Sequence, residues 1–338
     1  MKALLAPLSW LYGLAIAIRH SLYEHHLLPS HRVKTATICV GNLAVGGTGK
    51  TPHVEYLLRM LSTQYKVAVL SRGYKRKTRG FVLADEHASA TTIGDEAMQI
   101  HRKFPDIAVA VCEKRVRGVK ELKRRIPDLQ VVILDDAFQH SAIRCGYYIL
   151  LTPYNQLYIH DHLLPWGRLR DLKSTALKAN SVIVTQCPPE MQPIDFRVIS
   201  NQLRLPPYQS LFFSRLQYKV TPQTEEAFRN KKARILVVTG IAQPDYLMAY
   251  VRQRKPDAQL LAFSDHHRFS KRDIAKIEKC ATNFDYVLTT EKDYQRLAET
   301  TLVTTLGMRL LTLPIEVQLC TDQSNFSQDI HNYITQNL

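Results

Sequence analysis

The densest run of glycine in this 338-residue sequence, GNLAVGGTGKT from Gly41 to Thr51, ends in a lysine and a threonine. Such residues bind phosphate. Backbone N–H groups of the turn and of the next helix surround the oxygens, lysine reaches the terminal phosphates, and the threonine hydroxyl binds Mg²⁺. The motif G-x-x-x-x-G-K-[ST] is missed only at its first position, Ala44. The residues expected to hold a nucleotide are Ala44, Val45, Gly46, Gly47, Thr48, Gly49, Lys50 and Thr51.

This phosphate loop does not by itself distinguish a switch, a motor and a kinase, and a glycine-rich turn with a chance lysine is the alternative. Val45 stands where the partitioning ATPases carry a lysine, which counts against that class. TEKD at Thr290–Asp293 does not match the N-K-x-D motif that reads the base in translational GTPases. An ATP-dependent enzyme is therefore favoured over a plain GTPase.

Paired acids follow an apolar run in VVILDDAFQH, Val131–His140. A carboxylate at the end of such a strand lies beside the metal of a nucleotide site, so Asp135 or Asp136 is expected to face Thr51. Gln139 is a candidate to orient a phosphate or the attacking group. An acidic turn without function is the alternative.

Two further acids, Asp95 and Glu96, open a helix in TIGDEAMQI. Helix capping and the helix dipole favour acids at this place without any function. A phosphotransferase also needs a carboxylate that accepts the proton of a hydroxyl group, and Asp95 is the candidate for that base.

Basic and imidazole side chains follow other predicted strands. Arg72 in SRGYKRKTR and Arg115 in EKRVRG are placed to contact phosphate, while the remaining cations of these runs are expected on the surface. His266 and His267 in FSDHHRFS are candidates to assist a carboxylate base, although a helix cap by Asp265 explains the same stretch and a zinc site is weakly supported.

Short apolar runs alternate with amphipathic segments through most of the chain, which predicts a parallel sheet covered on both faces. The predicted strands are Thr35–Val40, Lys66–Leu70, Ile107–Cys112, Val131–Leu134, Tyr147–Leu151, Ser181–Thr185, Arg234–Val238, Gln259–Phe263 and Asp285–Leu288. The expected fold is α/β, with a P-loop NTPase-like parallel sheet domain followed by a second, smaller α/β domain. The expected division is a helix over 1–22, a P-loop kinase domain over 23–213, a linker over 214–232 and a smaller domain over 233–338 that closes the cleft.

The N-terminal segment from Ala3 to Ile18 contains sixteen residues without a charge. It is short for a helix that spans a bilayer, which needs about 20 apolar residues. A helix that lies in the membrane interface, with Trp10 and Tyr12 at headgroup level, is preferred to a cleaved signal peptide or a buried helix. We therefore expect contact with a membrane surface through residues 1–20.

The formal charge of +15, from 45 Lys and Arg against 30 Asp and Glu, needs an anionic partner. No nucleic-acid-binding motif accompanies the charge, so we expect no nucleic acid and favour phosphorylated molecules or anionic lipid. The six cysteines form no C-x-x-C pair, which indicates a reducing compartment without structural zinc or disulfides.

Taken in order, these motifs resemble the tetraacyldisaccharide 4'-kinase family of lipid A biosynthesis. The matching stretches are VGNLAVGGTGKTP, SRGY, GDE, DDAFQH, LLPWGRLR, TGIAQP, DHH and TEKD, and they extend to about residue 295. The departures are Ala137, where the family usually has glycine, Asp171, where it usually has glutamate, and Arg268, where proline is common. The shorter carboxylate of Asp171 puts a metal role at that position in doubt.

The resemblance implies transfer of the ATP γ-phosphate to the 4'-hydroxyl of a tetraacylated glucosamine disaccharide 1-phosphate, giving lipid IVA, on the cytoplasmic face of the inner membrane. It implies that Lys50 stabilises the transferring group, and that Thr51 holds Mg²⁺ with Asp135 and Glu96 nearby. It further implies that Asp95 is the base, that His266 or His267 supports it, and that Arg72, Arg115 and Gln139 contact phosphates. The alternatives are a membrane-associated P-loop ATPase switch without a lipid acceptor and a nucleic-acid-binding protein.

Overall fold

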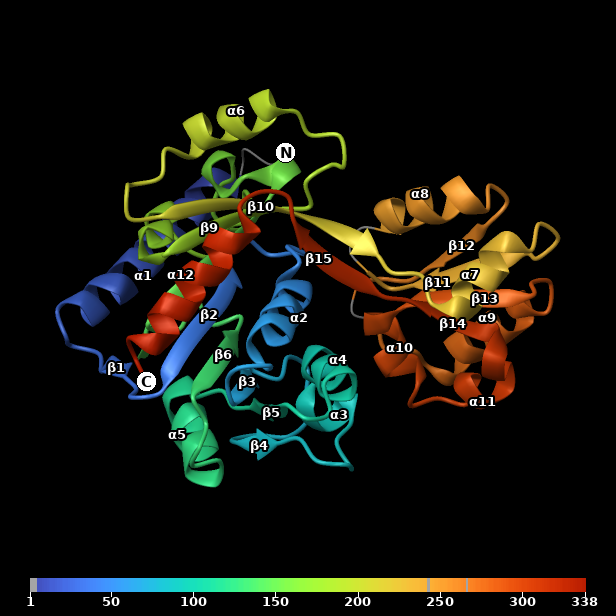
Figure 1. Cartoon of the computed structure of the whole chain (residues 1–338), viewed down its shortest axis with the longest axis horizontal. Coiled ribbons are helices and arrows are strands. Elements are labelled where there is room, and N and C mark those ends of the chain that lie inside the picture. The colour runs from blue at the N-terminus through green and yellow to red at the C-terminus, as the bar shows by residue number, and fades with distance from the viewer. Residues whose placement is uncertain (1–4, 242–243, 266) are drawn as a thin grey trace.

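A nine-stranded and a four-stranded sheet lie side by side in the computed structural model, which describes residues 5–241, 244–265 and 267–338 (Figure 1). In spatial order the larger sheet consists of β15 (Ile315–Leu319), β10 (Ser210–Tyr218), β9 (Ser181–Thr185), β8 (Tyr147–Pro153), β2 (Ala36–Asn42), β6 (Val131–Asp135), β3 (Val67–Ser71), β5 (Ala108–Val111) and β4 (Val82–Leu83). Its strands are parallel except for β15 and β4, which run antiparallel at its two edges.

The central strand β2 is buried along its whole length, including its polar residues Thr37 and Asn42, as expected of a strand inside a doubly covered parallel sheet. Its neighbouring residues point to opposite faces, so that Cys39 packs into one core while Ile38 and Val40 pack into the other. Both faces must therefore be covered by helices.

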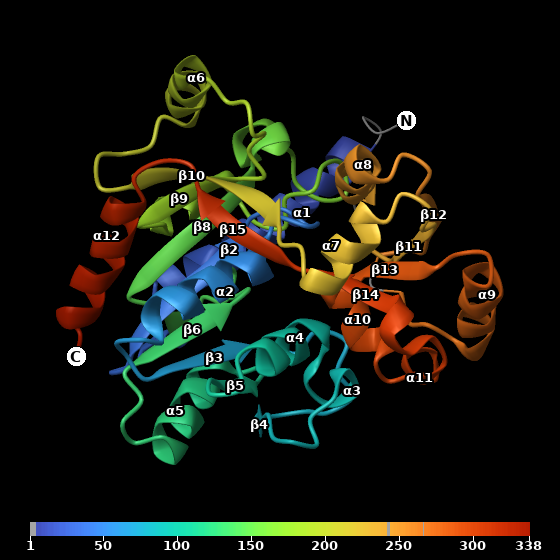
Figure 2. The ribbon, with the colours of Figure 1, turned by 45° about the vertical axis from the view of Figure 1, so that its right-hand side comes forward.

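Helices cover both faces of this sheet (Figures 1 and 2). On the Ile38 side lie α2 (Lys50–Leu61), α4 (Asp95–Lys103) and α12 (Gln323–Thr335). On the Cys39 side lie α5 (Arg115–Arg125) and α6 (Pro193–Leu203). The predicted doubly covered parallel sheet is confirmed.

The smaller sheet is entirely parallel, with the strand order β12 (Gln259–Ala262), β11 (Ile235–Thr239), β13 (Tyr286–Thr290) and β14 (Leu310–Leu313). One face is covered by α7 (Pro222–Arg229) and α8 (Pro244–Arg254). The other face is covered by α9 (Lys271–Ala281), α10 (Glu291–Leu297) and α11 (Leu302–Leu306).

The predicted boundaries between the two units are wrong in two respects. Segment 214–232, expected as a linker, contains the end of β10 and the helix α7. The last strand β15 and helix α12, expected in the smaller unit, return to the larger sheet, where β15 pairs with β10. The predicted strands include neither β10 nor β15, whose sequences SLFFSRLQY and IEVQL interrupt apolar residues with polar ones, and this omission explains both errors.

The first helix, α1 (Ala6–Glu24), lies against the larger unit through Ser9 and Gly13, which are buried. In the part of the chain that the structure describes, no helix is long and apolar enough to cross a bilayer. The remaining short elements are β1 (His31–Arg32), β7 (Ile143–Arg144), α3 (Ala90–Ile93) and 3-10 turns at Tyr154–Gln156, Tyr158–His160, Lys173–Lys178 and Gly307–Arg309.

Phe326 on α12 tests the assignment of the C-terminal helix to the larger unit. Its ring is 1% exposed and lies with its centroid 5.0 Å from that of Phe212 on β10 and 6.2 Å from that of Tyr56 on α2. We expect Phe326→Ala to lower the free energy of unfolding by about 3–5 kcal/mol because it leaves a cavity. Urea denaturation measures this loss, with Gln328→Ala on the exposed side of α12 as control. A loss below about 1 kcal/mol contradicts the assignment.

Candidate active site

The glycine-rich turn connects the buried strand β2 to the helix α2, in the strand–turn–helix order that a phosphate loop requires. Gly46 has a φ angle of +114° and Gly49 one of +83°, a region that residues with a side chain rarely adopt. These two glycines are therefore required by the backbone of the turn, and Gly49 caps the helix that begins at Lys50.

Ala44, the one departure from the motif, lies in an extended segment that pairs with the chain at Leu169. On either side of this bridge, the N–H of Val45 donates to the carbonyl of Arg168 and the N–H of Arg170 donates to that of Leu43, both at 2.8 Å. Ala44 is 6% exposed and does not have a positive φ angle. A glycine is not needed there, because the ladder with residues 168–170 fixes the entry to the turn.

Side chains from β9 and its following residue hold the carbonyl groups of the turn. Gln186 Nε2 donates to the Gly47 carbonyl at 2.7 Å, and Thr185 Oγ1 donates to the Thr48 carbonyl at 3.0 Å. With these oxygens bound, the first N–H groups of α2, which have no partner inside the helix, remain for phosphate.

His53, which the sequence did not single out, fixes the start of α2 from its buried side. Its Nδ1 lies 2.7 Å from the Gly49 carbonyl and its Nε2 lies 2.9 Å from Ser214 Oγ on β10. Burial lowers the pKa of His53 to about 4, so the ring is neutral at physiological pH. Since a carbonyl only accepts, Nδ1 carries the proton and Ser214 donates to Nε2.

Asn42 at the end of β2 is a second site residue that sequence reasoning missed. Its Nδ2 donates to the Ala44 carbonyl at 2.6 Å, while its Oδ1 accepts from Arg170 at 2.7 Å and from Lys50 Nζ at 3.4 Å. Its place in VGNLAVGG, and that of Arg170 in LLPWGRLR, were visible in the sequence, but nothing there indicated that the two segments meet. Asn42 thereby holds the lysine and the turn together.

The two acids after β6 have opposite environments. Asp135 is 1% exposed, and its Oδ1 lacks a hydrogen-bond partner among the described residues. Burial, with added repulsion from Glu96 and Asp136, raises the pKa of Asp135 to about 7. Burial also disfavours the charge of Asp136, but hydrogen bonds from Arg170 and the charge of Lys50, 3.9 Å away, keep the pKa of Asp136 below its usual value.

The three residues predicted to contact phosphate follow strands of the larger sheet, and they differ in their exposure and in their hydrogen bonds. Arg115 is 2% exposed and donates to the carbonyl of Cys112 at 2.9 Å, while its Nε has no partner among the described residues. Arg72 is exposed and lies close enough to affect the pKa of Arg115, which burial chiefly lowers. Gln139 donates through Nε2 to the Asn42 carbonyl at 2.6 Å, so its amide is engaged with the protein.

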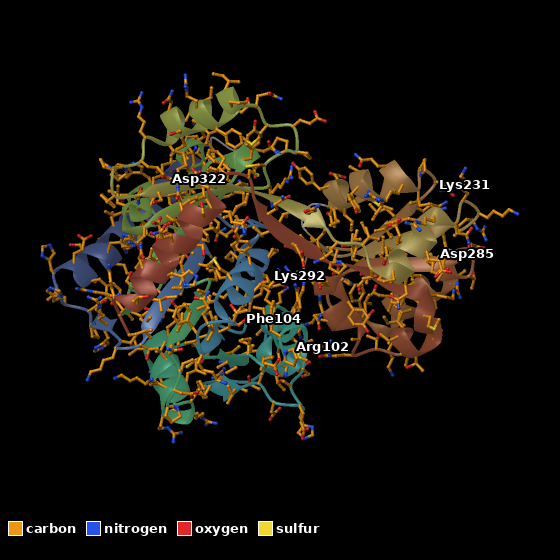
Figure 3. The ribbon with its side chains drawn as sticks, viewed as in Figure 1. Arg102, Phe104, Lys231, Asp285, Lys292 and Asp322 are labelled. Atoms are coloured by element: carbon orange, nitrogen blue, oxygen red, sulfur yellow. The ribbon has the colours of Figure 1, made fainter. Side chains whose placement is uncertain are left out.

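Asp95 and Glu96 start α4 and face the smaller unit. Arg296 Nε of α10 lies 3.5 Å from Asp95 Oδ2, and Lys292 Nζ lies 3.7 Å from Glu96 Oε1. Figure 3 shows Lys292 and Arg102 at this contact between the two units. Because Glu96 also acts on Asp135, the structure brings the acids of two predicted motifs together.

His266 lies outside the described residues. His267 follows β12, and its Nε2 lies 3.0 Å from Asp273 Oδ2 while its Nδ1 lies 3.3 Å from Ser264 Oγ. Its side chain is therefore bound within the smaller unit, close to the Ser270 cap of α9.

The Asp171 carboxylate is bound within the protein and so has a structural role. Its Oδ1 accepts from the Leu172 N–H at 2.8 Å and from Thr175 Oγ1 at 3.1 Å, and lies 3.0 Å from His20 Nε2 on α1. These contacts, at a side chain 2% exposed, join the segment that precedes it to α1.

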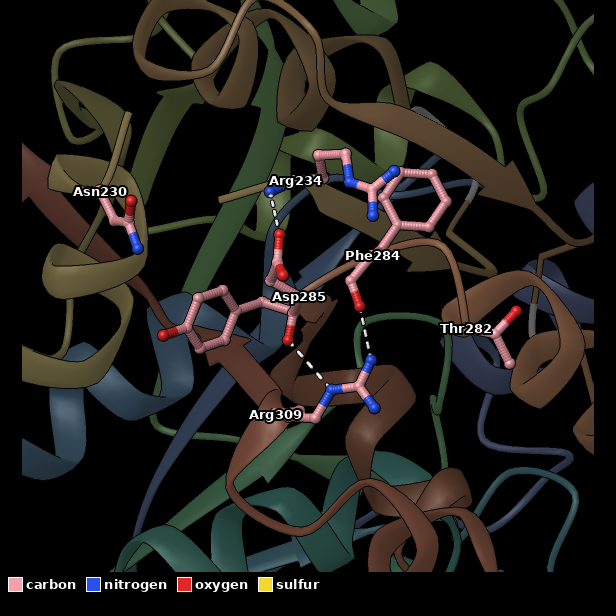
Figure 4. Close-up of a pocket in the computed structure, with 7 residues that line it drawn as sticks. Asn230, Arg234, Thr282, Phe284, Asp285 and Arg309 are labelled. Carbon is pink, nitrogen blue, oxygen red and sulfur yellow. Dashed lines mark hydrogen bonds between the residues drawn. The ribbon is translucent and has the colours of Figure 1, made fainter. Parts of the chain in front are cut away.

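A depression of about 470 Å³ lies elsewhere, at the amino ends of β11 and β13 (Figure 4). There the Asp285 carboxylate accepts from the Arg234 N–H at 2.7 Å, and the Asp285 backbone carbonyl accepts from Arg309 Nε at 3.1 Å. Ligands of parallel sheets bind at the opposite, carboxyl ends of the strands, so this depression is not the candidate site. Within the described residues, no three His, Cys, Asp or Glu side chains gather to hold a metal ion alone.

The raised pKa of Asp135 predicts a pH dependence of stability. Between pH 4 and about 7 the folded protein retains a proton that the unfolded chain releases, so stability falls as pH rises through this range. We expect Asp135→Asn to reduce the fall between pH 5 and pH 8 by on the order of 2 kcal/mol, measured by urea denaturation without nucleotide. Asp128→Asn, at an exposed carboxylate, is the control. An unchanged pH profile in Asp135→Asn would show that Asp135 ionises normally.

Comparison with known proteins agrees with this geometry. The family model described as Tetraacyldisaccharide-1-P 4'-kinase (LpxK) matches residues 1–335. A protein of Bacteroides fragilis named tetraacyldisaccharide 4'-kinase is 44% identical over 350 residues, covering 98% of this chain and 93% of that protein. One of the same name from Flavobacterium johnsoniae is 42% identical over 342 residues, covering 100% of this chain and 98% of that protein.

A solved structure shares the fold. The crystal structure of "apo" form LpxK from Aquifex aeolicus in complex with ATP has a TM-score of 0.77 and 24% identity, and the similarity covers 98% of this chain and 99% of that chain. The larger sheet, its phosphate loop and the smaller sheet are thus parts of a known arrangement. With a family model that matches nearly its whole length and relatives above 40% identity, this chain belongs to the tetraacyldisaccharide 4'-kinase family.

Proposed function

We propose that this protein transfers the γ-phosphate of ATP to the 4'-hydroxyl of tetraacyldisaccharide 1-phosphate and so forms lipid IVA in lipid A biosynthesis. The observation that carries the proposal is the family match over residues 1–335 on a chain whose phosphate loop and acids converge at one sheet edge. An ATPase switch without an acceptor is not favoured, because the family acts on a lipid disaccharide.

The phosphates of ATP lie in this proposal on the turn from Ala44 to Gly49 and on the N-terminus of α2. Lys50, held by Asn42 and close to Asp136, neutralises the transferring phosphoryl group. Arg115 and Arg72 contribute further positive charge from the ends of the neighbouring strands. Gln139 acts through the backbone of Asn42, to which it is bound.

The donor set fits Mg²⁺. Asp135 presents a buried oxygen without a hydrogen-bond partner among the described residues, as expected of a group that faces a cation. Asp135 and the Thr51 hydroxyl would hold the ion, with Glu96 nearby, whereas Asp136 is paired with Arg170. Held there, the ion would supply positive charge that neutralises the charge on the phosphates.

Asp95 is the proposed base. As the 4'-oxygen attacks the γ-phosphorus, the hydroxyl proton passes to the Asp95 carboxylate and the bond from phosphorus to the bridging oxygen of ADP breaks. The proposal is supported by the position of Asp95 at the start of α4, beside Glu96, whose charge acts on Asp135. His266 or His267 of the smaller unit supports this base in the proposal.

Helix α1 is proposed to hold the enzyme on the cytoplasmic face of the inner membrane. Its Trp10 is 79% exposed, and Leu11, Leu14 and Ile18 are also exposed along one side. The opposite side is bound to the protein, since Ser9 Oγ donates to the Leu163 carbonyl at 3.0 Å. An exposed apolar face on a helix otherwise anchored by its polar face is typical of interfacial helices.

Tyr12 does not share that exposed face. Its hydroxyl donates to the Arg170 carbonyl at 3.1 Å, so its expected position at headgroup level is not supported. The segment 161–171 therefore contacts both α1 and the phosphate loop.

The main test is phosphate transfer from radiolabelled ATP to tetraacyldisaccharide 1-phosphate in detergent micelles. We expect a labelled lipid with the wild-type protein and at least about a 100-fold lower kcat with Asp95→Asn, because the hydroxyl proton then lacks an acceptor. Binding of ATP, measured by calorimetry, should stay within about twofold, since Asp95 is not part of the phosphate loop.

Two outcomes would contradict this proposal at different levels. ATP hydrolysis without any labelled lipid, by protein that is folded and binds ATP, would favour the ATPase switch. Lipid phosphorylation at near wild-type rate by Asp95→Asn would keep the kinase and remove Asp95 as its base.

The membrane proposal predicts the effect of a triple change on α1. We expect Trp10→Ser, Leu14→Ser and Ile18→Ser together to lower co-sedimentation with anionic phospholipid vesicles at least about tenfold, because each side chain contributes about 1.5–3 kcal/mol when buried. The thermal midpoint should hardly change, since these side chains are exposed. Leu177→Ser, at an exposed leucine on another element, is the matched control. Unchanged sedimentation of the triple variant would locate the membrane contact elsewhere.

A further inference from the structure

Arg296 is the most deeply buried cation at the contact between the two units. Its side chain is 6% exposed, whereas those of Lys103 and Lys292 at the same contact are 21% and 26% exposed. A buried guanidinium group is stable only where its N–H groups meet acceptors. The acceptors around Arg296 therefore indicate what this side chain does.

Three nitrogens of Arg296 face three different segments. The NH2 group donates to Asp293 Oδ1 within α10, and the NH1 group donates to the His267 carbonyl, both at 2.7 Å. The Nε lies 3.5 Å from Asp95 Oδ2 and makes no hydrogen bond within the described residues. Arg296 thus joins the start of α4 to the loop after β12.

Asp293 fixes one side of this guanidinium group. Besides Arg296, it accepts from Thr239 Oγ1 at 2.7 Å, from the Gly240 N–H at 3.0 Å and from Thr290 Oγ1 at 2.8 Å. It is 0% exposed and bound by four donors from three segments. Arg296 consequently extends toward Asp95 from a position that Asp293 fixes within the smaller unit.

Other polar pairs also connect α10 to α4. Lys103 Nζ lies 2.7 Å from Glu291 Oε2, and Arg102 donates to Gln295 at 2.5 Å (Figure 3 shows Arg102). These pairs are at the far end of α4 from Asp95. They keep the two helices together without acting on the carboxylate itself.

We propose that Arg296 is a positioning residue of the reaction, which orients the Asp95 carboxylate toward the acceptor hydroxyl from the smaller unit. The inference rests on the proposed role of Asp95 as the base. An ion pair at 3.5 Å holds the carboxylate oxygen on the side of α10, and a shift of a few tenths of an ångström would turn it into a charge-assisted hydrogen bond. The same guanidinium group holds the loop of His267, so base and loop keep one relative position.

The test compares Arg296→Met with Arg296→Lys in the lipid phosphorylation assay. For Arg296→Met we expect kcat to fall at least about 30-fold with KM for ATP within about twofold, because a misplaced base slows the chemical step without affecting nucleotide binding. Arg296→Lys keeps the charge near Asp95 and should recover at least about a third of the wild-type kcat.

Thr239→Val separates positioning from stability. It removes one donor to Asp293, as Arg296→Met does, but leaves Arg296 beside Asp95. We expect the thermal midpoint to fall further in Arg296→Met, which leaves the buried Asp293 charge without its cation, so both variants are assayed at a temperature at which both are folded, and there we expect a kcat within about threefold of wild type for Thr239→Val only. Equal losses of kcat in both variants would overturn the proposal in favour of a purely structural role.

A double variant completes the test. If Arg296 acts through Asp95, adding Arg296→Met to Asp95→Asn lowers the residual kcat by less than about twofold. A further fall equal to that in the wild-type background would overturn the proposal. An inactive Asp95→Asn together with a fully active Arg296→Met refutes this inference alone, whereas a fully active Asp95→Asn refutes the proposed base itself.

Discussion

The structure depends on the balance of buried charge at the carboxyl ends of β2 and β6. Asp135 and Asp136 end β6 next to Glu96, and Lys50, Arg115 and Arg170 are the cations that compensate them. A buried charge without a partner costs several kcal/mol, so each of these side chains constrains the position of the others. The compensation is incomplete at Asp135, whose Oδ1 has no hydrogen-bond partner among the described residues, and in the proposed function a divalent cation would supply the missing positive charge.

This balance accounts for the segments that surround the phosphate loop. Arg170 can reach Asp136 only because residues 168–170 pair with residues 43–45 on the way into the turn. The same segment contacts α1 through Leu163, so the surface proposed to meet the membrane is one loop away from the nucleotide. This arrangement suits the proposed lipid acceptor, whose acyl chains would stay in the bilayer while its sugar reaches the γ-phosphate.

The smaller unit is related to the site through α10. The helix brings Lys292 to Glu96 and Arg296 to Asp95, while Asp293 fixes Arg296 from behind. Because the chain leaves the larger sheet along β10 and returns along β15, two connections rather than one determine where α10 lies. The motif TEKD, without any base-reading role, is therefore part of the contact between the units.

The sequence alone predicted most of the parallel strands from their short apolar runs, together with the phosphate loop, whose glycines permit few backbone conformations, but it did not predict β10, β14 or β15. It also predicted the roles of Lys50, Thr51 and Asp135, because these residue types at this spacing suit phosphate and metal binding. Only the tertiary structure decided that β15 and α12 return to the larger sheet. It also decided that Asn42 contacts Lys50, His53 the Gly49 carbonyl, Arg170 the Asp136 carboxylate and Arg296 the Asp95 carboxylate. The physical reason is that a strand pattern does not encode its pairing partner, and that a charge is compensated by whichever opposite charge the fold brings near, at any distance along the chain.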